Sequence, residues 1–145
     1  MNLADRLALA RDLLFIGVGN VLRSDDGVGV YISRRIILRS GIRVLTVEVS
    51  IENYIGKIQS MHPGEIILID CMDLGEEAGS HRILDIDELE DLTFNTHNIS
   101  LGRWKDFFPF PARVLGIQPM ELGFGDTLSP PVLRTADNII GLINP

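Results

Sequence analysis

Short continuous apolar runs alternate along the chain with segments in which apolar residues recur every three or four positions. A continuous run bounded by glycine, proline or aspartate is typical of a strand buried on both faces, whereas the wider spacing is typical of an amphipathic helix. The runs that predict strands are LLFIGVG (13–19), RVLTVEV (43–49), EIILID (65–70), HRILDI (81–86) and ARVLGI (112–117). We expect the fourth of these to be a short strand at an edge of the sheet.

The segment that follows the first apolar run predicts a helix from residue 26 to residue 40. Val28, Ile32 and Ile36 recur on one face of this segment, and Gly41 follows it as a stop signal. Further helices are predicted over 52–61 and 98–108, and residues 1–12 form a short amphipathic segment.

The last helix has the clearest signals. Ser129 is placed to cap it, and Pro130 fits its first turn. One apolar stripe follows, made of Val132, Ala136, Ile139, Ile140 and Ile143.

Apolar strands separated by amphipathic helices predict an α/β fold: a three-layer α/β/α sandwich with a mainly parallel sheet and helices on both faces. We expect residues 1–145 to form a single domain, with residues 1–12 as an N-terminal extension before the first strand. Ligand sites in such sheets form beyond the carboxyl ends of the strands. That rule directs attention to the loops that follow Gly17, Ile69 and Ile117.

Composition narrows the classes of function. Thirteen basic and twenty acidic residues give a net charge of -7, which disfavours nonspecific binding to nucleic acid or to anionic membranes. The single cysteine, Cys71, excludes an internal disulfide framework and a thiolate metal cage. No signal peptide is recognisable, and no run approaches the roughly 18 apolar residues of a membrane span. We therefore expect a soluble cytoplasmic protein.

The stretch GVGNVLRSDDGVG, residues 17–29, resembles a nucleotide-binding loop but carries the wrong charge. Leu22 occupies the third glycine position of a dinucleotide motif, and the loop has no phosphate-binding lysine. Its glycines are better suited to a tight turn after the strand. Asp25 and Asp26 could cap the following helix, but one aspartate is sufficient for a cap, which leaves the other to be explained.

Three residues from separate loops could form one site. Asp26 follows the first strand, Asp70 ends the third, and His97 precedes the helix predicted over 98–108. Taken singly, each has a structural explanation: a cap, a loop-initiating aspartate and a structural histidine. Together, two carboxylates and one imidazole could form an open site for a divalent transition metal such as nickel or zinc.

Four motifs, in order over nearly the whole chain, resemble those of the hydrogenase maturation endopeptidases, which process the large subunit of nickel–iron hydrogenases. GVGNVLRSDDGVG matches that family's G-x-G-N-x-L-x-x-D-[DE]-G-x-G signature. IDCMDLGEEAG matches its D-A-x-D-x-G region, and THNISL matches its histidine segment. GIQPMELGFGDTLSPPV resembles its G-I-[QKE]-P segment and closing L-[ST]-P. The THN and GIQP motifs are most similar to the corresponding motifs in the peptidases of formate-hydrogenlyase-type hydrogenases.

The resemblance implies an endopeptidase that removes a C-terminal extension from the nickel-loaded precursor of a hydrogenase large subunit. It implies that Asp26, Asp70 and His97 are the catalytic and metal-recognising residues, with the nickel carried by the substrate. We expect Gly19, Asn20 and Asp25 of the same loop to contact the substrate. No nucleic-acid partner and no membrane insertion are expected.

The sequence departs from the family pattern in two places and leaves two questions of function open. The family usually begins almost directly with the first strand, and it has a small residue where this chain has Glu48. The attacking water could be activated by a metal, or Asp25 or Asp70 could act as general base. The alternative to an enzyme is a nonenzymatic metal- or nucleotide-binding module that acts in hydrogenase assembly.

Overall fold

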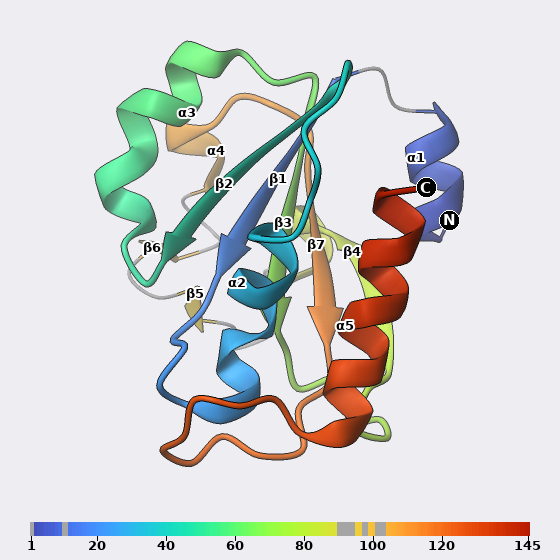
Figure 1. Cartoon of the computed structure of the whole chain (residues 1–145). Coiled ribbons are helices and arrows are strands. Elements are labelled where there is room, and N and C mark those ends of the chain that lie inside the picture. The colour runs from blue at the N-terminus through green and yellow to red at the C-terminus, as the bar shows by residue number, and fades with distance from the viewer. Residues whose placement is uncertain (1, 10–11, 90–94, 97–98, 101–103) are drawn as a thin grey trace.

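The computed structural model describes residues 2–9, 12–89, 95–96, 99–100 and 104–145. A five-stranded sheet forms its centre, with the strand order β2-β1-β3-β7-β4 (Figure 1). Strands β1, β2, β3 and β7 are parallel, and β4 lies at one edge, both as predicted; β4 pairs antiparallel with β7. The strand bounds are β1 (Leu13–Val18), β2 (Ile42–Glu48), β3 (Glu65–Cys71), β4 (His81–Asp85) and β7 (Ala112–Ile117).

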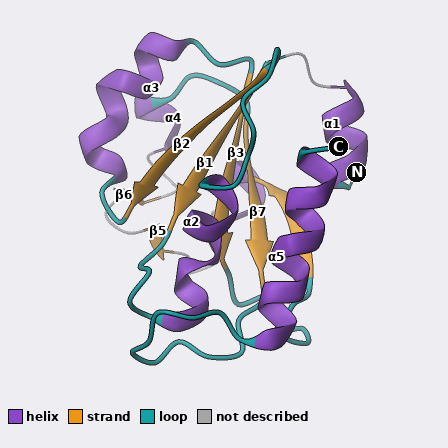
Figure 2. Cartoon of the chain, viewed as in Figure 1, coloured by secondary structure: helices purple, strands orange, loops and turns teal. Residues whose placement is uncertain are grey.

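Helices cover both faces of the sheet, which confirms the predicted three-layer α/β/α sandwich (Figure 2). The helices α1 (Leu3–Leu9), α2 (Val28–Ser33) and α5 (Pro130–Ile143) pack on one face. The helices α3 (Ile55–Met61) and α4 (Trp104–Phe107) lie on the other. Short 3₁₀ turns η1 (Ser24–Gly27), η2 (Ile51–Tyr54) and η3 (Ile86–Leu89) join these elements.

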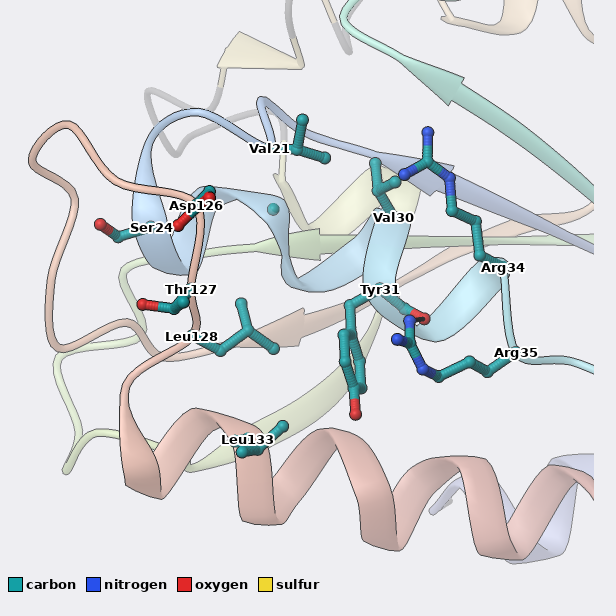
Figure 3. Close-up of a pocket in the computed structure, with 11 residues that line it drawn as sticks. Val21, Ser24, Val30, Tyr31, Arg34, Arg35, Asp126, Thr127, Leu128 and Leu133 are labelled. Atoms are coloured by element: carbon teal, nitrogen blue, oxygen red, sulfur yellow. Dashed lines mark hydrogen bonds between the residues drawn. The ribbon is translucent and has the colours of Figure 1, made fainter.

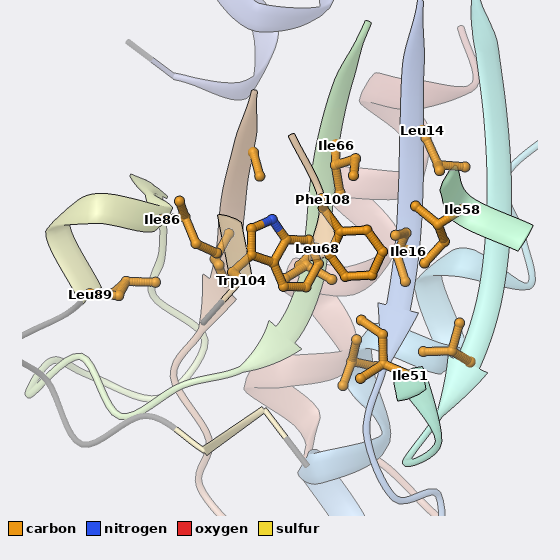
Figure 4. Close-up of a cluster of buried hydrophobic side chains, with 14 of the residues drawn as sticks. Leu14, Ile16, Ile51, Ile58, Ile66, Leu68, Ile86, Leu89, Trp104 and Phe108 are labelled. Atoms are coloured by element: carbon orange, nitrogen blue, oxygen red, sulfur yellow. The ribbon is translucent and has the colours of Figure 1, made fainter. Parts of the chain in front are cut away.

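The central strands are buried on both faces because alternate side chains point to opposite sides of the sheet. In β1, Leu13 and Phe15 pack against α2 and α5, whereas Leu14 and Ile16 pack against the other layer. That second layer is centred on Trp104, whose ring lies 4.4 Å from the ring of Phe108 (Figure 4). This continuous burial explains why the strands read as unbroken apolar runs.

The helix predicted over 26–40 is much shorter in the structure. It begins as the 3₁₀ turn η1, and α2 ends at Ser33. Asn144, just after α5, replaces the missing helical hydrogen bonds: its side-chain oxygen accepts from the N–H of Ile37 at 2.9 Å, and its amide donates to the carbonyl of Arg35 at 2.7 Å. A contact between distant parts of the sequence therefore overrides the local apolar pattern.

The helix predicted over 98–108 is also wrong in its first part. Ile99–Ser100 forms strand β6, which pairs antiparallel with β5 (Asn95–Thr96) in a separate two-stranded sheet. Within the described residues of this segment, helix is confined to α4 (Trp104–Phe107). The β5–β6 pair has no signal in the sequence, because two residues per strand are too few to show an alternating pattern.

The N-terminal segment packs on the domain. Leu3 is only 2% exposed and joins the apolar cluster beneath α2 and α5. Arg6 forms an ion pair with Glu65, the first residue of β3, and Glu65 also pairs with Arg113 of β7. Among the residues that the structure describes, no helix is long and apolar enough to cross a membrane.

Candidate active site

The sheet places the loop after β1 and the end of β3 side by side. From β1 the strand order runs to β2 on one side and to β3 on the other, so the direction of winding reverses between β1 and β3. In open α/β sheets, this switch point at the carboxyl ends of the strands is where ligands bind. Asp26 lies in the loop after β1, and Asp70 lies near the carboxyl end of β3.

Asp26 is held in η1 close to the end of β1. Its side chain is only 8% exposed, and its Oδ2 accepts a hydrogen bond from the backbone N–H of Asn20 at 2.9 Å. The side-chain oxygen of Asn20 accepts in turn from the N–H of Leu22 at 2.9 Å. The polar residues of the glycine loop therefore shape the turn that presents Asp26. Substrate contact by Gly19 and Asn20 stays a prediction.

Asp70 is the deeper of the two acids. It is 1% exposed, and its Oδ1 accepts a hydrogen bond from the N–H of Cys71 at 2.7 Å. Burial, and next the negative charge of Asp26, raise the pKa of Asp70 well above its usual range, and the Cys71 N–H opposes this only in part. Asp26 and Asp70 thus form a buried pair of carboxyls that disfavours two negative charges.

Gly19 separates the two carboxyl-bearing segments. Its φ of 139° is a conformation that side-chain-bearing residues rarely adopt, and a Cβ placed on it would lie 1.9 Å from the carbonyl oxygen of Asp26. The same Cβ would lie 3.7 Å from Oδ1 of Asp70. Only a residue without a side chain fits at this point, next to the Asp26 carbonyl and the Asp70 carboxyl.

Gly29 serves a different purpose in the same motif. A Cβ there would lie 2.0 Å from the carbonyl oxygen of Ile69 and 2.5 Å from that of Val18. The glycine therefore lets α2 pack directly against β1 and β3. Close backbone packing explains why Gly19 and Gly29 are glycines, and no phosphate ligand is needed to explain them.

The structure gives Asp25 a structural role, and its predicted substrate contact stays a prediction. Its side chain is fully buried and accepts hydrogen bonds from the N–H groups of Met120, Glu121 and Ser129 and from the hydroxyl of Ser129, at 2.7–2.9 Å. Although burial alone would raise the pKa of Asp25, these hydrogen bonds outweigh it and lower the pKa. Asp25 joins the glycine loop to the segment before α5.

The hydrogen bonding of the Ser129 hydroxyl is explained by its contact with Asp25. It occupies the N-cap position of α5, and proline follows in the first turn, as predicted. Its side chain makes no capping hydrogen bond, because the hydroxyl donates to Asp25 instead. The sequence identified the position correctly but assigned the hydroxyl to the wrong partner.

Gln118 and Asp73 organise the loop after β3, a role that the sequence analysis did not find. The side-chain oxygen of Gln118 accepts from the N–H of Leu74 at 2.5 Å, and its amide donates to Oδ1 of Asp73 at 3.3 Å. Gln118 is 9% exposed. The signal that could have revealed it is a glutamine directly after the buried strand β7, where a buried amide needs partners.

Glu48 does not contribute its carboxylate to the pair. Its side chain pairs with Arg34 at 3.0 Å, and both side chains are about half exposed. The backbone of Glu48 supports the site, because its carbonyl accepts from the N–H of Gly19 at 3.0 Å. Glu48 adopts this position with a φ of 54°, which is unfavourable for any residue other than glycine.

The third predicted site residue, His97, lies outside the described residues. The described histidines are elsewhere: His62 ends α3, and His81 begins the edge strand β4. Within the described part of the chain, no three histidine, cysteine, aspartate or glutamate side chains are grouped to hold a metal ion. The structure thus brings together two of the three predicted ligands, Asp26 and Asp70.

A pocket of about 480 Å³ lies next to η1, between α2 and the segment before α5 (Figure 3). Its lining includes neither Asp26 nor Asp70 but does include Ser24 and Gly27 from η1. The guanidinium of Arg35 stacks 3.6 Å above the ring of Tyr31 at its edge. The pocket is a separate hollow next to the turn that carries Asp26.

Comparison with known proteins gives a consistent result. Residues 31–145 match the family HycI, described as hydrogenase maturation protease. A putative hydrogenase maturation protease of Methanocaldococcus jannaschii is 26% identical over 136 residues, covering 84% of this chain and 80% of that protein. The hydrogenase 3 maturation protease of Escherichia coli K12 is 27% identical over 128 residues, covering 84% and 82%.

Solved structures share the fold. The crystal structure of the NiFe hydrogenase maturation protease HycI from Thermococcus kodakarensis KOD1 has a TM-score of 0.81 over 99% of both chains, at 23% identity. HybD, a hydrogenase maturating endopeptidase of E. coli, has a TM-score of 0.73 over 91% of this chain and 89% of that chain, at 22% identity.

Proposed function

Since the chain belongs to the HycI family of hydrogenase maturation proteases, we propose that it removes a C-terminal extension from the nickel-loaded precursor of a nickel–iron hydrogenase large subunit. Membership of this family makes it a hydrolase of the endopeptidase class. The observation that carries the proposal is the buried pair Asp26 and Asp70 at the switch point of the sheet.

The acid pair is suited to recognising a cation that the substrate carries. A carboxyl pair in which burial and the charge of Asp26 raise the pKa of Asp70 is stabilised either by a proton or by a positive ion. Nickel on the precursor would supply that ion, and Asp70 would lose its proton as the ion is bound. A precursor without nickel would leave Asp70 protonated and would be held less well.

His97 would complete the donor set with one imidazole nitrogen. Two carboxylate oxygens and one imidazole suit a divalent transition ion and leave further coordination positions for the precursor's own ligands. Nickel therefore belongs to the substrate in this proposal, and Asp26, Asp70 and His97 bind it as a recognition element.

The same pair is also the best candidate for the acid chemistry of peptide hydrolysis. Asp25 accepts four hydrogen bonds and is fully buried, so its carboxylate is already engaged. Asp26 and Asp70 lie at the carboxyl ends of β1 and β3, where ligands bind in open α/β sheets. We assign to this pair the handling of the proton that the attacking water gives up.

The test uses purified precursor with and without nickel, and mass spectrometry of the C-terminus of the precursor after incubation with the protein. We expect cleavage of the nickel-loaded precursor and little or none of the nickel-free precursor. Failure to cleave the nickel-loaded precursor from the organism that encodes this protein would remove the protease assignment. Equal cleavage of both forms would keep the protease and remove nickel recognition.

Substitutions assign the roles. Asp70→Asn and His97→Ala should each abolish processing while the far-ultraviolet circular dichroism spectrum stays unchanged. Asp137→Asn is the matched control, because that carboxylate lies on α5 and binds the hydroxyl of Tyr31. Full processing by His97→Ala would exclude His97 from the site. Calorimetric binding of nickel or a dinucleotide, without cleavage of the loaded precursor, would favour a nonenzymatic assembly module.

A further inference from the structure

Two segments that are distant in the sequence run side by side next to the acid pair. Residues 22–24, before η1, lie parallel to residues 123–125, before α5, with a bridge between Arg23 and Gly125. The N–H of Ser24 donates to the carbonyl of Gly125 at 2.8 Å, and the N–H of Gly125 donates to the carbonyl of Leu22 at 2.9 Å. The Ser24 hydroxyl adds a bond to the carbonyl of Gly123 at 2.8 Å.

Large apolar side chains on this two-segment ribbon and directly before its second segment are exposed. Phe124 is 92% exposed, Met120 66%, Leu22 53% and Leu122 40%. We call these four residues the apolar rim. The parallel register places Leu22 opposite Phe124, because Arg23 pairs with Gly125. Grouped apolar side chains that stay in water are typical of a surface that another molecule covers.

The apolar rim is fixed to the turn that carries Asp26. The N–H of Asp25 donates to the carbonyl of Glu121 at 3.0 Å, and the Asp25 carboxylate accepts from the N–H groups of Met120 and Glu121. Asp25 is adjacent to Asp26 in η1. A molecule that contacts the rim is therefore held at a defined position relative to the acid pair.

We propose that the apolar rim docks an apolar segment of the precursor large subunit and so holds the precursor over Asp26 and Asp70. The proposal rests on the proposed function, and it adds a binding surface outside the reacting residues. Hydrogen bonds to Asp25 hold the rim next to η1, so a second copy of this chain seated there would occupy the surface beside the turn that the precursor must reach. Ser24 of the ribbon and Asp126, directly after it, line the 480 Å³ pocket, and this pocket offers the precursor a hollow beside the rim.

The test measures steady-state processing of the nickel-loaded precursor from the same host by the double variant Leu22→Ser/Phe124→Ser. Both side chains are exposed, so the fold should be retained. Removing apolar contacts that only hold the substrate raises KM and leaves kcat unchanged. We expect KM to rise about tenfold or more, as for central residues of an interface.

The matched control is Ile37→Ser/Leu38→Ser. These side chains are 66% and 65% exposed. They precede the amino end of β2, whereas Asp70 lies near the carboxyl end of β3, at the opposite end of the parallel strands. We expect their loss to leave both KM and kcat unchanged. An equal rise in KM for both double variants would overturn the proposal, since any exposed apolar pair would then have the same effect.

Further outcomes separate this proposal from the one on which it rests. Absence of cleavage by the wild-type protein removes the proposed function itself. Normal cleavage by the wild type with an unchanged KM in Leu22→Ser/Phe124→Ser removes only the docking surface. Light scattering identifies the competing occupant: a wild-type dimer that this variant converts to monomer, with KM unchanged, would assign the rim to a second copy of the chain.

Discussion

The backbone carbonyl of Asp26 and Oδ1 of Asp70 both lie close to Gly19, and the charge of Asp26 adds to burial in raising the pKa of Asp70. The relationship depends on two adjacent parallel strands that end at the same edge of the sheet. It places the Asp70 carboxyl, which holds its proton tightly, next to the carboxyl of Asp26, which lies nearer the surface. Such a pair costs stability when both members are ionised and gains stability when a cation or a proton is present.

Asp70 should make the protein less stable at high pH. A carboxyl whose pKa is higher in the folded state stabilises the fold below its unfolded pKa of about 3.9, and this contribution is lost as the pH rises through the folded pKa. Each pH unit between the two values changes the free energy of unfolding by about 1.4 kcal/mol. Asp70→Asn cannot ionise and should be more stable than wild type at pH 8 in a chelating buffer.

Urea unfolding from pH 4 to pH 9 measures this difference. The two proteins should have similar stability near pH 4 and should diverge as the pH rises. Addition of nickel or zinc should narrow the gap at pH 8, because a bound cation compensates the charge of the wild-type pair. Parallel stability curves for wild type and Asp70→Asn would contradict the raised pKa.

Gly19→Ala should destabilise the protein by at least about 2 kcal/mol, because the new Cβ meets the Asp26 carbonyl and the backbone conformation is unfavourable. Gly141→Ala is the matched control. Gly141 lies in α5, and a Cβ there has nothing within 4 Å. Alanine in an exposed helix should increase stability by about 0.5–1 kcal/mol. Thermal and urea unfolding would show opposite shifts for the two variants, and equal shifts would refute the close approach at Gly19.

Asp25→Asn should cost about 2–4 kcal/mol at pH 7, because one carboxylate oxygen becomes an amide that faces N–H donors. Ser129→Ala removes one hydroxyl donor and should cost about 1 kcal/mol. The pKa of Asp25 is lowered, so its contribution is present above about pH 3.9 and is lost as the pH falls through the folded pKa. Chemical unfolding at pH 7 and pH 3 should show the Asp25→Asn deficit shrinking in acid, and an equal deficit at both pH values would be inconsistent with an ionised Asp25.

The sheet could be predicted from the sequence because each strand is buried on both faces and leaves an unbroken apolar run. β7 matches its predicted bounds, and β3 extends one residue beyond them. The position of Asp70 at the carboxyl end of β3 follows from this run alone. Its proximity to the loop after β1 follows from the rule for parallel sheets, and the pairing of β1 with β3 confirms it.

The remaining features depend on contacts that have no local signal. Asn144 ends α2 from the far end of the chain, and Asp25 binds Ser129 across more than a hundred positions. Neither pair is visible as a periodic pattern. A structural aspartate and a substrate-binding aspartate look alike in the sequence, so the hydrogen bonds that Asp25 accepts become apparent only in the structure.

Glu48 should be dispensable for processing and unfavourable for stability. Its carboxylate pairs with Arg34 at the surface, where such pairs contribute less than about 1 kcal/mol, and its φ of 54° favours glycine. Glu48→Gln should therefore change stability by less than about 1 kcal/mol, and Glu48→Gly should increase it by about 0.5–1 kcal/mol as the strain is relieved. Both variants should process the nickel-loaded precursor at the wild-type rate, since the Glu48 carbonyl that accepts from Gly19 is retained. Loss of processing in Glu48→Gln, with stability unchanged, would instead place the carboxylate among the reacting groups.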